Sequence, residues 1–289
     1  MDDIDGPKLA AFDFQGPQNI EFLEYLGEGL HAHVVRVRIK GQEYALKLFR
    51  FLSNVDWYGP GDLGMNNSVD RITALAHYSE PFYAECRAFG RLHETGHTDL
   101  ALPCYGYILL DEEHEKKLHD KFVLRFNGSD EQPGDDEDDF RARYPGARSG
   151  RPPPIRGILK ALGSCIPLDD DEVPNLSVRD AKRLLRETVQ MQQLGIIDLD
   201  LRREQLIDGK FCDLSTAVTV PHFLTTPELN PLLEERSCAA MEYETFLHSI
   251  NDYWMYSDMI LSSCSKYRQQ TSNLLDNATA FPRSVWVKR

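Results

Sequence analysis

Lys47 is a positive charge inside an otherwise apolar stretch, residues 44–49 (YALKLF), whose pattern is typical of a buried strand. A lysine among apolar neighbours is costly unless a carboxylate or a phosphate meets it. Glu85 is the candidate carboxylate, because it shares one helix face with Phe82 and Phe89. We therefore expect Lys47 and Glu85 to pair beside a phosphate-bearing ligand. The alternative is a glutamate at the edge of that face, reaching solvent.

A Gly-Glu-Gly turn, from Gly27 to Gly29, lies between two expected strands, the second of which contains Val34 to Ile39. Glycines at such a turn let backbone N–H groups approach phosphate oxygens that a side chain would block. Taken alone, the pattern is more typical of an ordinary hairpin turn.

A second hairpin is expected near residue 208. Asp208-Gly209 stands between two short apolar runs, which is a strong signal for a two-residue turn. With that turn, Leu206 lies opposite Phe211, and the strands on both sides are only a few residues long.

The same hairpin brings acidic and amide side chains together at its open end. Gln205 lies opposite Cys212, so Gln205 and Asp213 leave the ribbon side by side, and Asp200 can loop over the same end. Two carboxylates and an amide could hold a magnesium ion and orient a hydroxyl group. The alternative is a surface hairpin flanked by solvated acids.

Charge and hydropathy narrow the class of protein. The chain has 289 residues and a formal net charge of -14, which disfavours direct binding to nucleic acid. No stretch approaches the ~18 to 20 apolar residues of a membrane span. The acidic start, residues 1–5, does not resemble a secretory signal. We therefore expect an intracellular protein, cytoplasmic or nuclear, in which most of the six scattered cysteines are reduced core residues.

The elements that must position these groups alternate between strand and helix patterns. Residues 1–19 are expected to be an irregular leader, residues 57–67 a loop, and Ser79 the N-cap of a helix that ends near Leu92. A further helix is expected from Ser177 to a cap at Gly195, and apolar helical stretches follow between residues 241 and 261. Residues 100–110 and 155–162 are the remaining strand patterns.

Residues 127–154 form the clearest shift in composition. Five consecutive acids at 135–139 are followed by arginines and by prolines 152–154. Such a segment buries too little apolar surface to offset its ordering entropy, so we expect a disordered insert. It is either a solvated loop without a function or a partner-binding tail.

Taken in order, these pieces resemble the protein-kinase-like fold. The motifs that carry the resemblance are Leu26 to Gly29 as the glycine-rich loop, Ala45 to Lys47 as the lysine strand, Glu85 as its partner, Asp200 to Ile207 as the catalytic loop, Asp213 to Ser215 in place of DFG, and Thr226 to Glu228 in place of APE. The resemblance implies an α+β, two-lobed architecture. An antiparallel β N-lobe with one helix would span 20–162, and an abbreviated, mainly helical C-lobe would span 163–289.

The resemblance also implies ligands and roles. ATP would lie between the lobes, against Gly27, Gly29 and a hinge at 158–162 that includes Leu159 and Ala161. Lys47 would bind the phosphates, and Glu85 would orient Lys47. Asp213 would bind Mg²⁺ with help from Gln205. Asp200 would accept the proton of the substrate hydroxyl, and Arg202 would offset charge on the transferred phosphoryl group.

Departures from the family pattern leave the activity open. Ala32 replaces the third glycine of the loop, Asp198 the histidine of the catalytic loop, and Gln205 its asparagine. Leu214 and Ser215 replace the Phe and Gly of DFG. One interpretation is weak phosphoryl transfer to a hydroxyl acceptor. The other is a catalytically impaired pseudokinase used as a protein-interaction module, and a relic fold that binds nothing is a third.

The chain further resembles a fungal family of kinase-like proteins that includes a kinetochore-complex subunit. The segments 27–51, 83–107 and 200–215 carry this likeness. It implies a nuclear, scaffold-type role, with protein partners bound through the 127–154 insert or the C-terminal helices.

Overall fold

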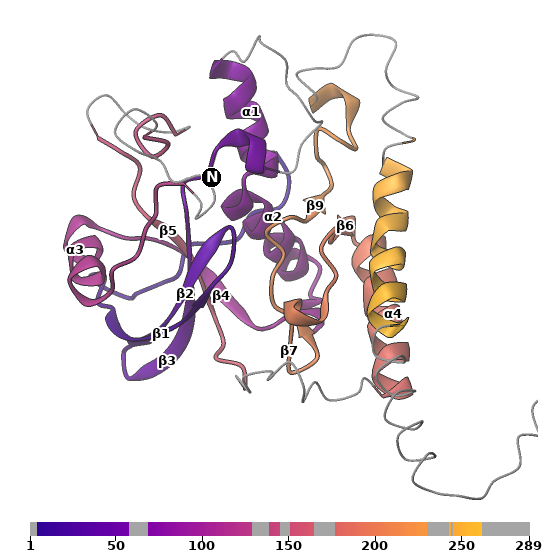
Figure 1. Ribbon diagram of the computed structural model, residues 1–289, viewed down its shortest axis with the longest axis horizontal. Coiled ribbons are helices and arrows are strands. Elements are labelled where there is room, and N and C mark those ends of the chain that lie inside the picture. Colours follow the sequence, from indigo (N-terminus) through magenta and orange to yellow (C-terminus); the bar gives the residue numbers. More distant parts are fainter. Residues whose placement is uncertain are drawn as a thin grey trace, which may run out of the picture.

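The computed structural model describes residues 5–57, 69–128, 139–144, 151–164, 177–229, 243 and 245–261. Its largest element is a five-stranded antiparallel sheet in the order β1-β2-β3-β5-β4 (Figure 1). The strands are β1 (Glu21–Glu28), β2 (Ala32–Ile39), β3 (Gln42–Phe49), β4 (Cys104–Leu109) and β5 (Arg156–Lys160). With the helices described below, this makes the fold mixed α+β, as predicted.

The β2–β3 hairpin forms where the sequence pattern places it. Its turn uses Lys40 and Gly41, both with positive φ, a conformation that glycine adopts without strain. Along β2, Val35 and Val37 are fully buried and alternate with half-buried positions. This period of two fixes which face of the sheet each residue presents.

Four helices carry labels in Figure 1: α1 (Val69–Ser79), α2 (Pro81–Glu94), α3 (Glu112–Lys121) and α4 (Val178–Gln193). The prediction of one helix within 20–162 is wrong, because α1, α2 and α3 all lie there. The N-cap prediction for α2 is wrong by one residue. Ser79 ends α1, and the Glu80 side chain accepts a hydrogen bond from the Tyr83 N–H instead.

The sequence analysis did not predict the α3 helix, because nearly all of its residues are polar (EEHEKKLHDK) and only His114 and Leu118 are buried. The features of the sequence that favour a helix here are a capping residue and the placement of charges. Asp111 caps its first turn, which is acidic, and His119 and Lys121 lie in its last turn, so the charges complement the helix dipole.

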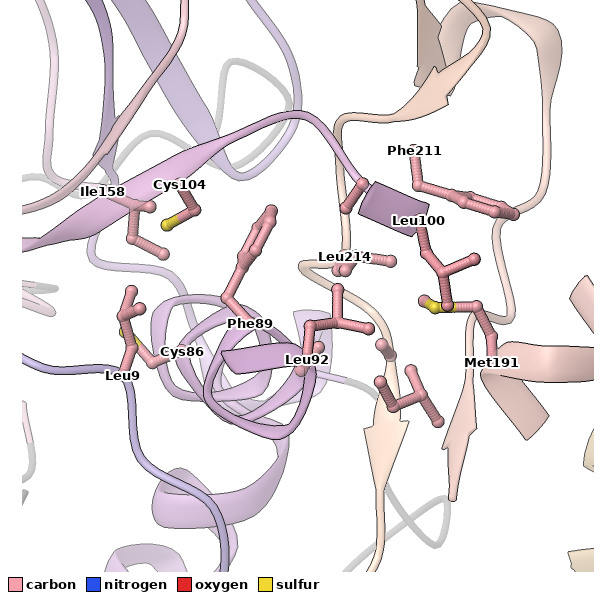
Figure 2. Packing of buried hydrophobic residues seen from close by; sticks show 14 of the residues in the cluster. Leu9, Cys86, Phe89, Leu92, Leu100, Cys104, Ile158, Met191, Phe211 and Leu214 are labelled. Carbon is pink, nitrogen blue, oxygen red and sulfur yellow. The ribbon is translucent and has the colours of Figure 1, made fainter. Parts of the chain in front are cut away.

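The main core joins the sheet to the C-terminal half of the chain through α2. Figure 2 shows Ile158 and Cys104 from the sheet, Phe89 from α2 and Phe211 and Leu214 from beyond it within one packed cluster. A second cluster lies on the other face of the sheet, around Val35, Leu46 and Leu159. In the following, the sheet half means residues 5–164 and the helical half residues 177–261.

The helical half is built on two antiparallel helices. Residues 245–261 form a helix beside α4 (Figure 1), with the Tyr256 hydroxyl donating to the Ala181 carbonyl and the Gln192 amide donating to Asp252. Both helices were predicted, and the caps of α4 at Ser177 and Gly195 are confirmed. Short strands complete this half: β6 (Ile196–Ile197), β7 (Leu206–Ile207), β8 (Lys210–Phe211) and β9 (Val218–Thr219).

The described part of the leader, residues 5–19, is irregular as predicted but packed. The Phe12 N–H donates to the Tyr107 carbonyl, and the Tyr107 N–H donates to the Ala10 carbonyl, so the leader covers the free edge of β4. Leu9 is buried in the main core.

The prediction of disorder across 127–154 is wrong for residues 139–144. Tyr144 is buried against Phe51 and Trp57, and the Arg141 Nη2 donates to both carboxylate oxygens of Glu115. These side chains supply the apolar area and charge pairing that the average composition of the segment hides. Residues 129–138 and 145–150 lie outside the described part of the chain, as do residues 58–67 of the expected loop.

Within the described residues, no helix combines the length and the hydropathy that crossing a bilayer requires.

Candidate functional site

Lys47 and Glu85 form the buried ion pair that the sequence predicts. The Lys47 Nζ lies 2.8 Å from the Glu85 Oε2 and 2.6 Å from the Asp213 Oδ1. Strand β3 aims Lys47 at α2 because its neighbours Leu46 and Leu48 are fully buried and point to the other face of the sheet. One ammonium group therefore links the sheet, α2 and the helical half.

A second lysine, Lys160 at the end of β5, shares the same glutamate. Its Nζ donates to the Glu85 Oε1 and to the Cys212 carbonyl, and it lies 4.9 Å from the centre of the Phe89 ring. The sequence analysis did not single out Lys160. The argument used for Lys47, a charge inside an apolar strand, applies equally to residues 156–160 and would have found it.

Electrostatic attraction keeps Lys47 and Asp213 ionised. Burial alone would lower the pKa of Lys47, but the charges of Asp213 and Glu85 outweigh burial and hold it above its ordinary value. Burial would raise the pKa of Asp213, yet the charges of Lys47 and Lys160 hold it well below its ordinary value. Lys47 and Asp213 are therefore both charged at neutral pH and form an ion pair.

The hairpin at residues 206–211 has the register that the sequence predicts. Leu206 pairs with Phe211, Ile207 with Lys210, and Asp208 and Gly209 both adopt positive φ in the turn. The Cys212 N–H donates to the Gln205 carbonyl, so Gln205 and residue 213 leave the ribbon together.

Asp200 is held by two donors in front of this hairpin. The Gln205 Nε2 lies 2.8 Å and the Arg202 Nη2 2.6 Å from the same oxygen, Asp200 Oδ2. Asp200, Gln205 and Asp213 do line one cleft. Among the described residues, however, no group of three His, Cys, Asp or Glu side chains could hold a metal ion.

The glycine turn between β1 and β2 covers this cleft. Gly27 has φ of 147°, and a Cβ at Gly27 or Gly29 would meet no atom within 4 Å, so open space lies above both residues. The turn is tied down on two sides. Glu28 pairs with Arg50, and His31 Nδ1 lies 2.9 Å from the Ser215 hydroxyl of the helical half.

His31 is a cleft residue that sequence reasoning missed. Burial, aided by the charge of Lys47, lowers its pKa to about 4, so the ring is neutral at physiological pH. No motif marks it, because its partner Ser215 is 184 positions away along the chain.

The cleft beneath the glycine turn has a volume of about 740 Å³. Most of the predicted site residues line it: Gly27, Gly29, Lys47, Ala161, Asp200, Arg202, Gln205 and Asp213. Two do not. Glu85 lies behind Lys47, and Leu159 is buried in the second core cluster, because alternation along β5 turns Lys160 rather than Leu159 toward the cleft.

Behind the cleft, two acids lie close together in the interior. Asp252 accepts hydrogen bonds from the N–H groups of Asp198 and Leu199. The side chain of Asp198 is buried, and among the described residues neither of its oxygens has a hydrogen-bond partner. Burial and the charge of Asp252 raise the pKa of Asp198 well above its ordinary value, so the folded state favours its neutral form.

Comparison with known families shows to which family the chain belongs. Residues 1–218, about three quarters of the sequence, match the family described as kinetochore Sim4 complex subunit FTA2. The chain belongs to the FTA2 family. No curated protein matches it.

The FTA2 match covers the whole sheet half and the cleft. Lys47, Glu85, Asp200 and Asp213 all lie inside it, and it ends at Val218 in β9. The helix at residues 245–261 lies beyond the matched region.

Proposed function

We propose that this FTA2-family chain is a nuclear protein-interaction subunit of a kinetochore complex. The observation that carries the proposal is the family match over residues 1–218. The sequence resemblance to a kinetochore-subunit family supports the same conclusion, and the family description implies protein partners. Partner contacts are proposed for the acidic insert at 127–154 and for the C-terminal helices.

The geometry of the cleft supports a subunit that holds its shape rather than turning over substrate. Asp213, the carboxylate that would hold Mg²⁺, is already paired with Lys47, and Asp200 is engaged by Arg202 and Gln205. The chemical groups thus satisfy one another. Catalytic groups with this pairing would have to exchange partners before they met a substrate.

The test is centromere occupancy of the full-length chain. The tagged chain is expressed from its own locus, and chromatin immunoprecipitation compares centromeric with chromosome-arm DNA. We expect clear enrichment at centromeres, together with co-elution in a complex larger than the chain alone. Equal recovery of both DNA regions would contradict the proposal.

Nucleotide binding in the cleft is the second candidate function, and a specific set of contacts favours it. A kinase-like two-lobed fold requires a strand lysine paired to a helix glutamate, an aspartate beside this pair and an open glycine turn above it. Lys47, Gly27 and Gly29 would hold phosphates, and Ala161 would lie against the base. Mg²⁺ would use Asp213 and Gln205, completed by phosphate oxygens and water.

In this second candidate, weak phosphoryl transfer would use Asp200 as proton acceptor and Arg202 to offset charge. A thermal-shift titration with ATP, with and without Mg²⁺, tests binding. A ligand at 100 times its Kd stabilises the folded state by about 2.7 kcal/mol. The candidate requires a Mg²⁺-dependent rise in Tm that Asp213→Asn abolishes and that Asp120→Asn, an exposed acid on α3, retains. No rise at millimolar ATP would remove it.

A further inference from the structure

The helix at residues 245–261 has two faces of different character. One face packs on α4 and the main core through Met255, Tyr256 and Met259. The opposite face is also apolar, and within the described part of the chain most of its side chains are exposed. We call it the apolar stripe: Tyr243, Phe246, Ile250, Trp254 and Leu261.

The exposure of the stripe is unusual for such large side chains. Tyr243, Phe246, Trp254 and Leu261 are 57% to 62% exposed, and Ile250 is half-buried. Single exposed apolar residues need no explanation, but a helix face with three exposed aromatic rings marks an interaction surface. In Figure 1 this helix lies alongside α4 at the right-hand side of the view, away from the sheet.

The spacing of the residues in the apolar stripe indicates which kind of structure can bind to it. Steps of three, four, four and seven residues keep these side chains on one face over five turns, about 27 Å along the helix axis. A long, narrow apolar stripe on a helix is matched by another helix that packs alongside it.

Charge argues against a second copy of this chain as that occupant. Residues 237–265 contain no lysine or arginine, and their acids apart from the buried Asp252 are Glu242, Glu244 and Asp258. Asp258 is exposed beside the stripe, and the chain as a whole carries a formal charge of -14. Two copies would bring like charges together, so the complementary partner has basic flanks.

We infer that the apolar stripe docks an amphipathic helix of another protein, apolar on one face and flanked by lysine or arginine. This inference rests on the proposed function, because it gives the interaction subunit its contact surface. The stripe lies outside the region that matches the FTA2 family, so the family assignment alone does not supply it.

The test uses the full-length chain and two synthetic helical peptides. Both carry leucines at alternating three- and four-residue spacing, and they differ only in having lysine or glutamate at the flanking positions. Fluorescence of Trp254 follows binding, with Trp254→Phe identifying its share of the signal. We expect the lysine peptide to bind at least tenfold more tightly than the glutamate peptide, with the preference shrinking as salt rises.

Two variants make the site assignment specific. Phe246→Glu with Trp254→Glu, followed by the anisotropy of a labelled peptide, is expected to weaken binding of the lysine peptide at least tenfold. Val123→Glu is the matched control, since Val123 is 97% exposed on a separate segment, and it is expected to bind as the wild type does. Circular dichroism checks that each variant is folded.

Three results would overturn the inference: equal binding of both peptides, no binding of either, or a self-associated chain that Trp254→Glu dissociates in sedimentation velocity. Each is separable from a failure of the proposed function. Centromere occupancy that persists in the Phe246→Glu, Trp254→Glu variant would leave the subunit role standing and reject only this surface.

Discussion

At the scale of single residues, Glu85 has the largest expected energetic role. It is fully buried and neutralises both Lys47 and Lys160. Removing one partner of a buried ion pair leaves an uncompensated charge, which costs about 3–5 kcal/mol. We therefore expect Glu85→Ala to lower the free energy of unfolding by that amount in urea titrations.

Glu43 is the matched control for Glu85. It also bridges two cations, Arg36 and Arg38, but at the surface of the sheet. Because solvent screens such pairs, Glu43→Ala is expected to be much less harmful than Glu85→Ala. Equal effects of the two substitutions would contradict the burial argument.

At Asp198, in contrast to Glu85, we expect a substitution to raise the free energy of unfolding. Its raised pKa means that the folded state binds a proton more tightly than the unfolded state does, so stability falls as pH rises above the ordinary value of 3.8. Asp198→Asn removes the titration. We expect it to raise the urea midpoint at pH 7 and to change it little near pH 4. A variant less stable than wild type at pH 7 would refute the assignment.

The buried pairing of Lys47 with Glu85 could be predicted from sequence because both arguments are local: a charge in an apolar strand, and a carboxylate on an apolar helix face. Lys160 follows from the same logic. His31 does not, because its burial depends on a contact with Ser215, which only the folded chain brings near.

At the scale of elements, α2 is shaped to receive the leader. A Cβ on Gly90 would lie 2.5 to 2.8 Å from backbone atoms of Lys8 and Leu9. Alanine favours a helix over glycine by about 1 kcal/mol, but the clash with backbone outweighs this. We expect Gly90→Ala to destabilise the protein by about 1–3 kcal/mol and to speed amide hydrogen exchange in residues 8–12.

Gly29→Ala serves as the comparison, since a Cβ there meets nothing within 4 Å and its φ is not in the left-handed region. It is expected to leave exchange in residues 8–12 unchanged. A stabilising Gly90→Ala would mean that helix propensity, not leader packing, dominates at this position.

Helices and strands were predicted correctly from the sequence where the turn or capping residues and the spacing of apolar residues indicate the same element. The Asp208-Gly209 hairpin and the Ser177 cap of α4 are both confirmed. It failed for α3, whose residues are mostly polar, and for residues 139–144, where Arg141 and Tyr144 find partners in other elements.

At the scale of the whole molecule, two neutral histidines, the half-buried His31 and the buried His222, join the two halves. His31 meets Ser215, and His222 donates from Nε2 to the Tyr78 carbonyl while its Nδ1 accepts from the Leu224 N–H. Burial, with a smaller contribution from the charge of Arg87, lowers the pKa of His222 to about 3. A proton on Nδ1 would replace an acceptor with a second donor.

The pH dependence of His222 follows from that shift. Between about pH 6.5 and 3 the unfolded chain binds a proton that the folded chain does not, so the stability due to neutral His222 is present above 6.5 and is lost on acidification. We expect the stability difference between wild type and His222→Gln to shrink as pH falls from 7 to 4. A difference independent of pH would show that His222 does not titrate on unfolding.

The central claim is that the chain acts by binding proteins rather than by transferring phosphate. The most direct measurement is centromere occupancy, by chromatin immunoprecipitation, of wild type and of Asp200→Asn, each expressed at its own locus and matched for abundance. Asp200→Asn removes the one carboxylate proposed to accept a substrate proton and leaves the buried cluster around Lys47 intact. The account predicts equal occupancy and normal growth. Loss of growth or of occupancy in a folded, normally abundant Asp200→Asn chain would contradict it.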